Sequence, residues 1–428
     1  MFDPSVVANT LQRRREWIRR LWRDDQVNGV TYREVEAAVQ AMAQKGFDAS
    51  PAEALLPTGE ALYRAGRDED LLGVICQIRQ ALHEAPRKAP PDGTPTTLDE
   101  INVTWPSLRA GKPPAFDYFD KVLGGWQGKN IGCALGGILE GWTRSRIVEA
   151  YGLVEDYVQK PPSTLNDDIA FELVYLHALE ELGPDVTSAQ LGREWVAHLP
   201  LEYCYTAERV AMENLLRGLV PPESGSQDNP FSEWIGAQMK GEVCGLIAPG
   251  RPDLAAEYAY RDGIIAHERE GLYGELFVAA ATSLAFVTGD VWALVEGALH
   301  YIPPHSRYAA LVRQVMDWCR ATPDWQEVCA LVEQSYGREY HWVHVLPNAA
   351  VVLLALLMGQ GDFTRTVAIA TTCGLDVDSN GGVAGAIAGV FSGSAGIPER
   401  LKAPLGDEID TWVSGFERQS LTELTRRT

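Results

Sequence analysis

Two short segments each set two carboxylates beside a neutral oxygen donor, directly before a run of helical sequence. Their candidate ligands are Asn166, Asp167, Asp168, Asp376, Asp378 and Ser379. Four carboxylates with oxygen-only neighbours suit hard divalent cations, and two ions would balance that charge. The segments together therefore predict a site for two Mg²⁺ ions, where Mn²⁺ could also bind. Either segment alone is also typical of helix N-capping, which Asp, Asn and Ser all favour.

Glycine recurs at every fourth position in two further segments. The two sets are Gly124, Gly128, Gly132 and Gly136, and Gly381, Gly385, Gly389 and Gly393. Glycine inside a helix is about 1 kcal/mol less favourable than alanine, so these residues indicate a compensating packing role. A smooth ridge of glycine lets two helix backbones come close together, and we predict a central helix pair. A membrane-helix dimer is the weaker alternative, because neither segment is long and apolar enough to cross a bilayer.

Helical periodicity dominates the rest of the chain. Apolar residues recur with a spacing of about 3.6 residues, and sustained alternation typical of strands is absent. We therefore predict an all-α fold, a compact multi-helix domain with an N-terminal helical extension. The extension covers residues 1–84, and one of its helices has Thr31 as the predicted N-cap. Residues 85–114 are predicted to be a Pro-rich linker, and residues 115–428 the large domain.

The composition limits the kinds of binding partner and the cellular compartment that we expect for this protein. The 428 residues carry a net charge of -21, which disfavours nucleic acid as a stable partner. The seven cysteines are scattered without C-x-x-C spacing, which fits a reducing cytoplasm. The longest apolar run, 345–359, is too short to span a membrane, so we expect a cytoplasmic protein without a membrane partner. His341 and His344 lack a nearby thiol or acid and give little support for a zinc site. The oligomeric state stays open.

Three separated motifs resemble those of the ADP-ribosylglycohydrolase family, which includes the dinitrogenase reductase-activating glycohydrolases. Gly128-Lys-Asn-Ile-Gly-Cys-Ala-Leu-Gly-Gly-Ile-Leu-Glu140 is similar to the family's Gly-x-x-x-Gly-Asp-Ala-x-Gly-x-x-x-Glu. Asn166-Asp-Asp-Ile169 resembles Thr-Asp-Asp-Thr, and Leu375-Asp-Val-Asp-Ser379 resembles Gly-Asp-Thr-Asp-Thr. The resemblance covers roughly residues 115–425. The chain departs from the family at Cys133, Asn166 and Ile169, which stand for Asp, Thr and Thr.

The resemblance implies an all-helical fold with a binuclear Mg²⁺ site held from two sides. One side is Asn166, Asp167 and Asp168, and the other is Asp376, Asp378 and Ser379. Glu140 matches the family's acid beside the scissile bond, and either Glu140 or Asp378 would order the attacking water or take its proton. Gly236-Ala-Gln-Met-Lys240 resembles a family segment that lines the nucleotide side. The candidate substrate-binding residues are Trp126, Lys240, His267, Tyr273, Asn348 and Asn380.

The function expected from this resemblance is Mg²⁺-dependent hydrolysis of an ADP-ribosyl or related ribosyl N- or O-glycosidic bond. The substrate would be a small molecule or an ADP-ribosylated molecule. One alternative is a hydrolase of a small-molecule nucleoside or sugar glycoside in metabolism or biosynthesis, which the altered Asn166–Ile169 motif favours. A further alternative is a non-catalytic ADP-ribose-binding or crystallin-like protein, which the retained acids disfavour.

Overall fold

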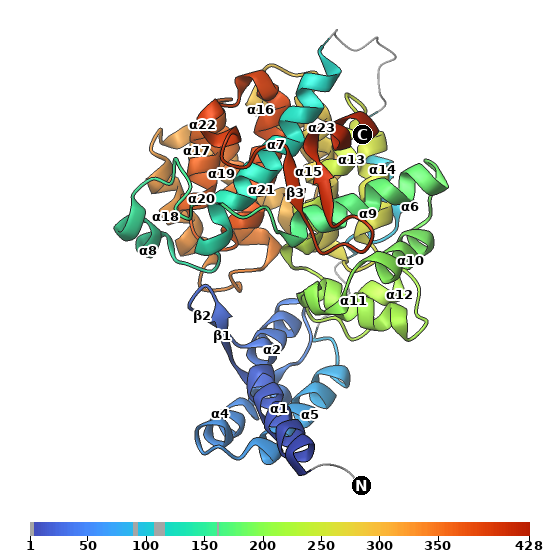
Figure 1. The fold of residues 1–428 in the computed structure, drawn as a ribbon, viewed down its shortest axis with the longest axis vertical. Coiled ribbons are helices and arrows are strands. Elements are labelled where there is room, and N and C mark those ends of the chain that lie inside the picture. The colour runs from blue at the N-terminus through green and yellow to red at the C-terminus, as the bar shows by residue number, and fades with distance from the viewer. Residues whose placement is uncertain (1–3, 89–92, 107–115, 161) are drawn as a thin grey trace. The chain divides into compact units, whose positions relative to one another are not determined.

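A computed structural model describes residues 4–88, 93–106, 116–160 and 162–428 (Figure 1). Its contacts divide the chain into two compact units, residues 1–92 and 93–428. The boundary falls inside the segment predicted as a linker, 85–114. Residues 89–92 and 107–115 of that prediction lie outside the described residues.

The first unit consists of helices and one short hairpin. Its elements are α1 (Pro4–Trp22), β1 (Asp24–Val27), β2 (Val30–Tyr32), α2 (Glu34–Gln44), α3 (Ser50–Glu53), α4 (Leu56–Arg64) and α5 (Asp68–His83). Ile18, Trp22 and Ile75 belong to its apolar core. The predicted helix start at Thr31 is wrong, because Thr31 lies in β2 and α2 begins at Glu34.

A tight turn between β1 and β2 explains why α2 begins later than predicted. Asn28 and Gly29 have positive φ angles of 49° and 70°, as the two central residues of a type I′ hairpin turn require. The strands pair antiparallel on either side of it, which holds residues 30–32 in extended conformation and delays the helix.

The second unit holds the remaining helices. Its first part contains α6 (Leu98–Ile101), η1 (Asn102–Thr104), α7 (Tyr118–Gly136), η2 (Gly137–Leu139), α8 (Arg144–Tyr151), α9 (Asp167–Leu182), α10 (Ser188–His198), η3 (Leu201–Tyr203), α11 (Thr206–Leu216), α12 (Glu223–Ser226), η4 (Ile235–Lys240), α13 (Glu242–Leu246) and α14 (Pro252–Gly263). Its second part contains α15 (Arg269–Ala285), α16 (Val291–Ala298), η5 (Leu299–Tyr301), α17 (Arg307–Ala321), α18 (Trp325–Tyr336), α19 (Val345–Gly359), α20 (Phe363–Thr372), α21 (Val377–Ser392), η6 (Ser394–Gly396), α22 (Glu399–Lys402), β3 (Glu408–Asp410), β4 (Arg418–Ser420) and α23 (Leu421–Arg427). The predicted all-α fold is confirmed, since the described strands form only two small antiparallel pairs.

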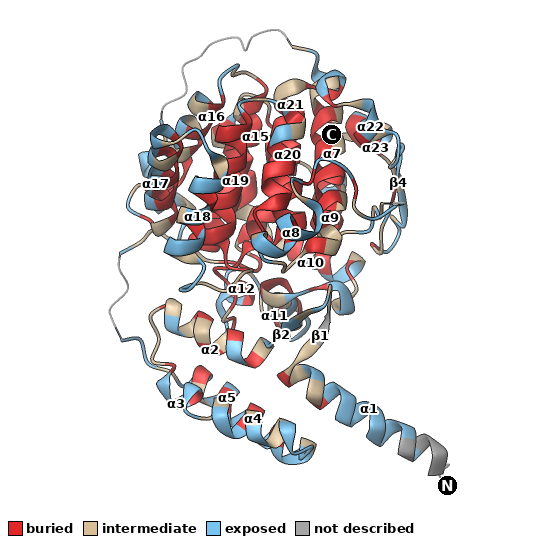
Figure 2. Ribbon diagram, turned by 90° about the vertical axis from the view of Figure 1, so that its left-hand side faces the viewer, coloured by how far each residue is buried: buried red, intermediate tan, exposed pale blue. Residues whose placement is uncertain are grey.

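A central group of helices forms the core of this unit. Figure 2 shows α15, α19 and α20 almost wholly buried, whereas α17 and α18 expose one face. Every residue of α19 is buried, which explains the apolar run 345–359 as a core helix. None of the described helices combines the length and apolarity needed to cross a membrane.

The predicted glycine-lined helix pair is α7 with α21 (Figure 1). The glycines face one another in antiparallel register, Gly124 against Gly389, Gly128 against Gly385 and Gly132 against Gly381. A Cβ atom added at Gly381 would lie 2.6 Å from the carbonyl oxygen of Gly132, so even alanine would push the backbones apart. This pairing sets the C-terminal end of α7 beside the N-terminal end of α21, where the predicted acids lie.

Residues 93–106 are an ordered part of the second unit. The carbonyl of Pro95 accepts a hydrogen bond from Tyr273, and that of Thr96 accepts one from Tyr260 at 3.2 Å. Trp105 donates to the carbonyl of Tyr301 at 3.1 Å. This half of the predicted linker therefore packs on the large domain.

Candidate active site

Three carboxylates meet where the ends of α7 and α21 come together. Oxygen atoms of Glu140, Asp376 and Asp378 all lie within 4.8 Å of one another. Glu140 directly follows η2, and the next residue, Gly141, donates its N–H to the carbonyl of Leu375 at 2.8 Å. Leu375 in turn donates to the carbonyl of Trp142 at 3.2 Å. These reciprocal bonds join the segment after Glu140 to the segment before Asp376.

The turn that leads into Asp376 has an unusual backbone. Gly374 and Leu375 have φ angles of 79° and 72°, a region that residues with a side chain rarely adopt. A Cβ atom at Gly374 would lie 2.7 Å from the carbonyl oxygen of Trp142, so the close approach also requires glycine. The turn therefore depends on Gly374 and aims Asp376 at Glu140.

The two predicted acidic segments are bonded to each other. Asn166 donates from Nδ2 to Asp378 Oδ2 at 3.1 Å, and Ser379 donates from Oγ to Asp168 Oδ1 at 3.2 Å. The capping alternative is confirmed for Asn166, whose Oδ1 accepts the N–H of Asp168 at 2.8 Å. Asp376 also stands at a helix start, yet its side chain makes no capping bond. Its carboxylate is therefore available to a ligand.

Burial and mutual repulsion raise the pKa values of these acids. The pKa of Glu140 lies well above its usual range because of burial and the charges of Asp378 and Asp167. Burial, Asp378 and Glu140 raise the pKa of Asp376 in the same way, and burial, Asp168 and Asp378 raise that of Asp167. Asp378 Oδ1 is buried without a hydrogen-bond partner among the described residues. Such an oxygen-only donor set, short of compensating charge, fits a hard divalent cation.

Lys129 is a site residue that sequence reasoning missed. It is buried in α7, where its Nζ lies 3.4 Å from Asp168 Oδ2 and 3.0 Å from Glu242 Oε1. Burial raises the pKa of Asp168 to about 7, although the charge of Lys129 opposes the shift. Cys133 Sγ also lies 3.6 Å from Asp168 Oδ2. Buried neighbours therefore fix the position of Asp168. The signal in the sequence that could have identified Lys129 was a lysine inside the glycine-lined helix.

Two predicted substrate-binding residues lie beside the acids. Asn348 Oδ1 accepts from the N–H of Asp376 at 3.2 Å and from Asn380 Nδ2 at 2.7 Å. Asn348 also donates to the carbonyl of His344 at 2.9 Å. This amide pair supports the turn at Asp376 from its buried side.

The other four predicted substrate-binding residues lie in the interior, each at most 1% exposed: Trp126, Lys240, His267 and Tyr273. Trp126 donates to Thr428 Oγ1 at 3.0 Å. Lys240 forms buried ion pairs with Asp262 and Glu275. The Nε2 atom of His267 lies 3.5 Å from Oε1 of Glu208, and Tyr273 donates to the carbonyl of Pro95. These contacts favour structural roles for all four.

Tyr205 is a second residue that the sequence analysis did not single out. It is 52% exposed, and its pKa is raised to about 12 by burial and by the negative charges of Asp167 and Glu140. Tyr205 is thus a partly exposed aromatic residue within electrostatic reach of the acidic cluster. Nearby in sequence, Tyr203 stacks on Trp412 with ring centroids 4.7 Å apart.

The chain belongs to the ADP-ribosylglycohydrolase family, whose sequence model matches residues 115–428. A solved structure, an ADP-ribosylglycohydrolase-related protein complex, matches with a TM-score of 0.51 and 23% identity. That match covers 66% of this chain and 91% of the other, and it shows a likeness of fold. The predicted family resemblance is confirmed.

Two relatives carry no assigned activity. An uncharacterized protein of Archaeoglobus fulgidus is 26% identical over 310 residues, which are 70% of this chain and 93% of that protein. The uncharacterized protein YegU of Escherichia coli K12 is 22% identical over 317 residues, which are 67% and 92% of the two chains. Family membership supports a glycosidic hydrolase.

Proposed function

We propose that the protein is a Mg²⁺-dependent hydrolase of an ADP-ribosyl or related ribosyl N- or O-glycosidic bond. The observation that carries this proposal is the meeting of Glu140, Asp376 and Asp378 within 4.8 Å, at the junction of the glycine-lined helices. No lysine or arginine is paired with these three carboxylates among the described ion pairs. Membership of the family supports the reaction class.

The carboxylates of Asp167, Asp376 and Asp378 would hold two Mg²⁺ ions, with Mn²⁺ as a substitute. Asn166 and Ser379 would orient them, because both are hydrogen-bonded to acids of the set. The bound ions would offset the carboxylate charge, hold ribose hydroxyls and make water more acidic. Direct ligation by Asn166, Asp168 and Ser379 stays a prediction.

The chain's own part in the reaction is to place and deprotonate water. Glu140 would accept one proton from the attacking water while the water oxygen bonds to the anomeric carbon, and Asp378 is the second candidate for this role. The bond from that carbon to the leaving nitrogen or oxygen breaks, and the leaving atom takes up the proton that the carboxylate accepted from water, which regenerates the carboxylate. Positioned proton transfer of this kind contributes about 10²- to 10⁴-fold in rate.

Tyr205 supplies the substrate side of the proposal. Its half-exposed ring stands beside Asp167 and Glu140, where it would stack on an aromatic or sugar part of the substrate. A small nucleoside or sugar glycoside is the second candidate substrate. The altered Asn166–Ile169 motif favours it.

The test combines thermal unfolding with a hydrolysis assay. Mg²⁺ at about 100 times its Kd should stabilise the wild type by about 2.7 kcal/mol. Asp378→Asn should lose this stabilisation by Mg²⁺, which we call the Mg²⁺ shift. Asp324→Asn is the matched control, because Asp324 also lies at the start of a helix but is exposed outside the cluster, and Asn can keep its helix cap. An absent Mg²⁺ response, or one that survives in Asp378→Asn, would contradict the metal site.

The substrate arm uses ADP-ribosylated protein, ADP-ribose and a panel of nucleosides and glycosides. Release of ADP-ribose with Mg²⁺ supports the first substrate class, and hydrolysis of a small glycoside alone supports the second. Glu140→Gln should lower kcat by at least about 100-fold while the Mg²⁺ shift remains. Mg²⁺ and ADP-ribose binding without turnover of any substrate would instead identify a non-catalytic protein.

A further inference from the structure

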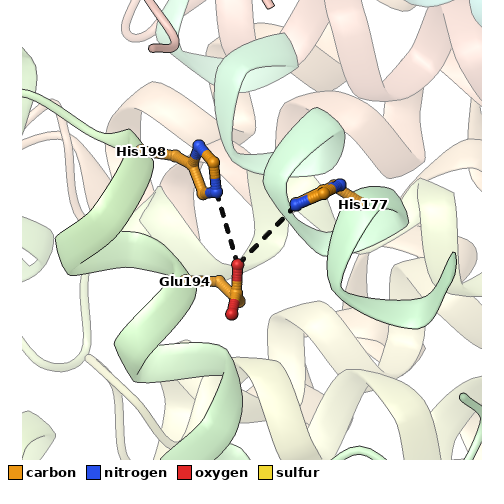
Figure 3. Close-up of side chains that lie close together, drawn as sticks. All are labelled: His177, Glu194 and His198. Atoms are coloured by element: carbon orange, nitrogen blue, oxygen red, sulfur yellow. Dashed lines mark ion pairs between the residues drawn. The ribbon is translucent and has the colours of Figure 1, made fainter. Parts of the chain in front are cut away.

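A second cluster of metal-binding side chains lies on the face formed by α9 and α10. Figure 3 shows His177 and His198 pointing toward the carboxylate of Glu194. One ligand atom from each of the three residues lies within 4.8 Å of the other two. His177 comes from α9, and Glu194 and His198 stand one turn apart on α10. All three side chains are between 21% and 23% exposed, so an ion can reach them.

The spacing of these atoms suits a shared ion better than direct bonds. Glu194 Oε2 lies 3.4 Å from His198 Nε2 and 3.8 Å from His177 Nε2. A charge-assisted hydrogen bond would be shorter, about 2.7–2.9 Å. Ligands held at about 2.0–2.1 Å around a tetrahedral Zn²⁺ lie roughly 3.4 Å apart. The side chains therefore need only a small adjustment to surround such an ion.

The loop between β3 and β4 orients one of the imidazoles. His198 Nδ1 lies 2.8 Å from the carbonyl oxygen of Ser414, and the N–H of Ser414 donates to the carbonyl of His198 at 2.9 Å. Because a carbonyl only accepts, Nδ1 carries a hydrogen, and Nε2 is the ring atom directed toward Glu194. Metal-bound histidines in proteins are held by the same kind of second bond.

Among the described ion pairs, no lysine or arginine is paired with the carboxylate of Glu194. The ring of Phe416 covers the histidines, with centroids 4.8 Å from that of His177 and 5.5 Å from that of His198. The guanidinium carbon of Arg427 lies 5.9 Å from the centroid of this ring, but the guanidinium is bonded to both carboxylate oxygens of Glu180. The cluster thus combines two imidazoles with one carboxylate, a donor set typical of Zn²⁺ and related transition metals rather than Mg²⁺.

We propose that His177, Glu194 and His198 bind one Zn²⁺-class ion, with water in the remaining position, and that this ion ties α9 to α10. The site is separate from the acidic cluster. His177 lies nine residues beyond Asp168 on the same helix, which is roughly 14 Å along its axis. An ion here stabilises the helix whose first turn carries Asp167 and Asp168.

The experiment is a Zn²⁺ titration by calorimetry on the full, untagged chain carrying Asp376→Asn and Asp378→Asn. These changes remove two of the three carboxylates that meet in the acidic cluster, so the remaining Zn²⁺ binding reports the second site. We expect one Zn²⁺ per chain, not displaced by millimolar Mg²⁺. His177→Gln and His198→Gln should each weaken binding at least about tenfold, and Glu194→Gln should weaken it as well. His305→Gln is the control, because His305 is an exposed histidine elsewhere in the unit.

Thermal unfolding separates loss of the ligand from loss of the fold. Zn²⁺ should raise the Tm of the background protein and of His305→Gln, and should leave the Tm of His177→Gln unchanged. The metal-free variants should unfold near the Tm of the background protein, since the mutated side chains are partly exposed. Absence of Zn²⁺ binding in the background protein, or equal binding in all four single-site variants, would overturn the proposal.

Discussion

Two buried lysines compensate many of the interior carboxylates of this protein. Lys129 is paired with Asp168 and Glu242, and Lys240 is paired with Asp262 and Glu275. Removing one member of a buried pair typically destabilises by about 3–5 kcal/mol, because the other charge is left alone. Among the described ion pairs, the acids Glu140, Asp376 and Asp378 have no such partner, and this difference supports the proposal that they form the active site.

Glu208 leads to a prediction about pH. Burial raises its pKa to about 7, although the charge of Lys240 opposes the shift. A glutamate in an unfolded chain has a pKa of about 4.3. Between these pH values the folded protein keeps the proton and the unfolded chain releases it. This group therefore makes the free energy of unfolding fall as the pH rises from about 4.3 to about 7.

Glu208→Gln should remove that contribution. We expect the wild type to lose up to about 3 kcal/mol more than the variant across this pH range, measured by urea unfolding at each pH. Glu213→Gln on the same helix is the surface control, because its side chain is 40% exposed. Parallel pH profiles for the wild type and Glu208→Gln would contradict the prediction.

At the scale of elements, the contact of α7 with α21 positions the candidate active-site residues. A Cβ atom at Gly136 would lie 2.5 Å from the Cα and N atoms of Asp378, so this glycine sets how closely the acid approaches Glu140. The neighbouring Gly137 has open space at the same position and a helical φ of -49°. The two glycines therefore offer a matched comparison.

Gly136→Ala should destabilise the protein by about 1–3 kcal/mol through overpacking, and should weaken the Mg²⁺ shift because Asp378 is displaced. Gly137→Ala should change stability by less than about 1 kcal/mol, in the stabilising direction, and should retain the Mg²⁺ shift. Thermal unfolding with and without Mg²⁺ measures both effects. Similar losses in the two variants would show that the helix contact does not control the site.

At the scale of the whole molecule, each unit has its own apolar core. We propose that residues 93–428 fold independently and carry the Mg²⁺ site. Residues 94–105 belong with this unit through Pro95, Thr96 and Trp105, whose hydrogen bonds were described above. Ile101 is also buried in its core.

Two truncated chains test this division. The fragment 93–428 should unfold cooperatively and retain the full Mg²⁺ shift. The fragment 115–428, which matches the family model, should be less stable by at least about 3 kcal/mol, because it loses the burial of Ile101 and three hydrogen bonds. Equal Tm values for the two fragments would show that residues 94–105 contribute little.

Local patterns in the sequence were sufficient for several features. Apolar spacing predicted the helices, and glycine at every fourth position predicted the close pair of α7 and α21. These patterns are local because the spacing of residues on one helix determines which face they share. The hairpin at Asn28 and Gly29 was missed although its signal is equally local, since Asn-Gly is the commonest tight-turn pair.

By itself, the sequence determined the helical class, the family motifs and the acids available for chemistry, because each depends on residues close together along the chain. Only the tertiary structure decided which side chains meet. It pairs Lys129 with Asp168 and brings His177 close to His198 from another helix. It also shows that the carboxylate of Asp376 makes no helix-capping bond. Contacts of this kind depend on the register and packing of helices that are distant in sequence. The spacing of residues within one segment therefore cannot predict them.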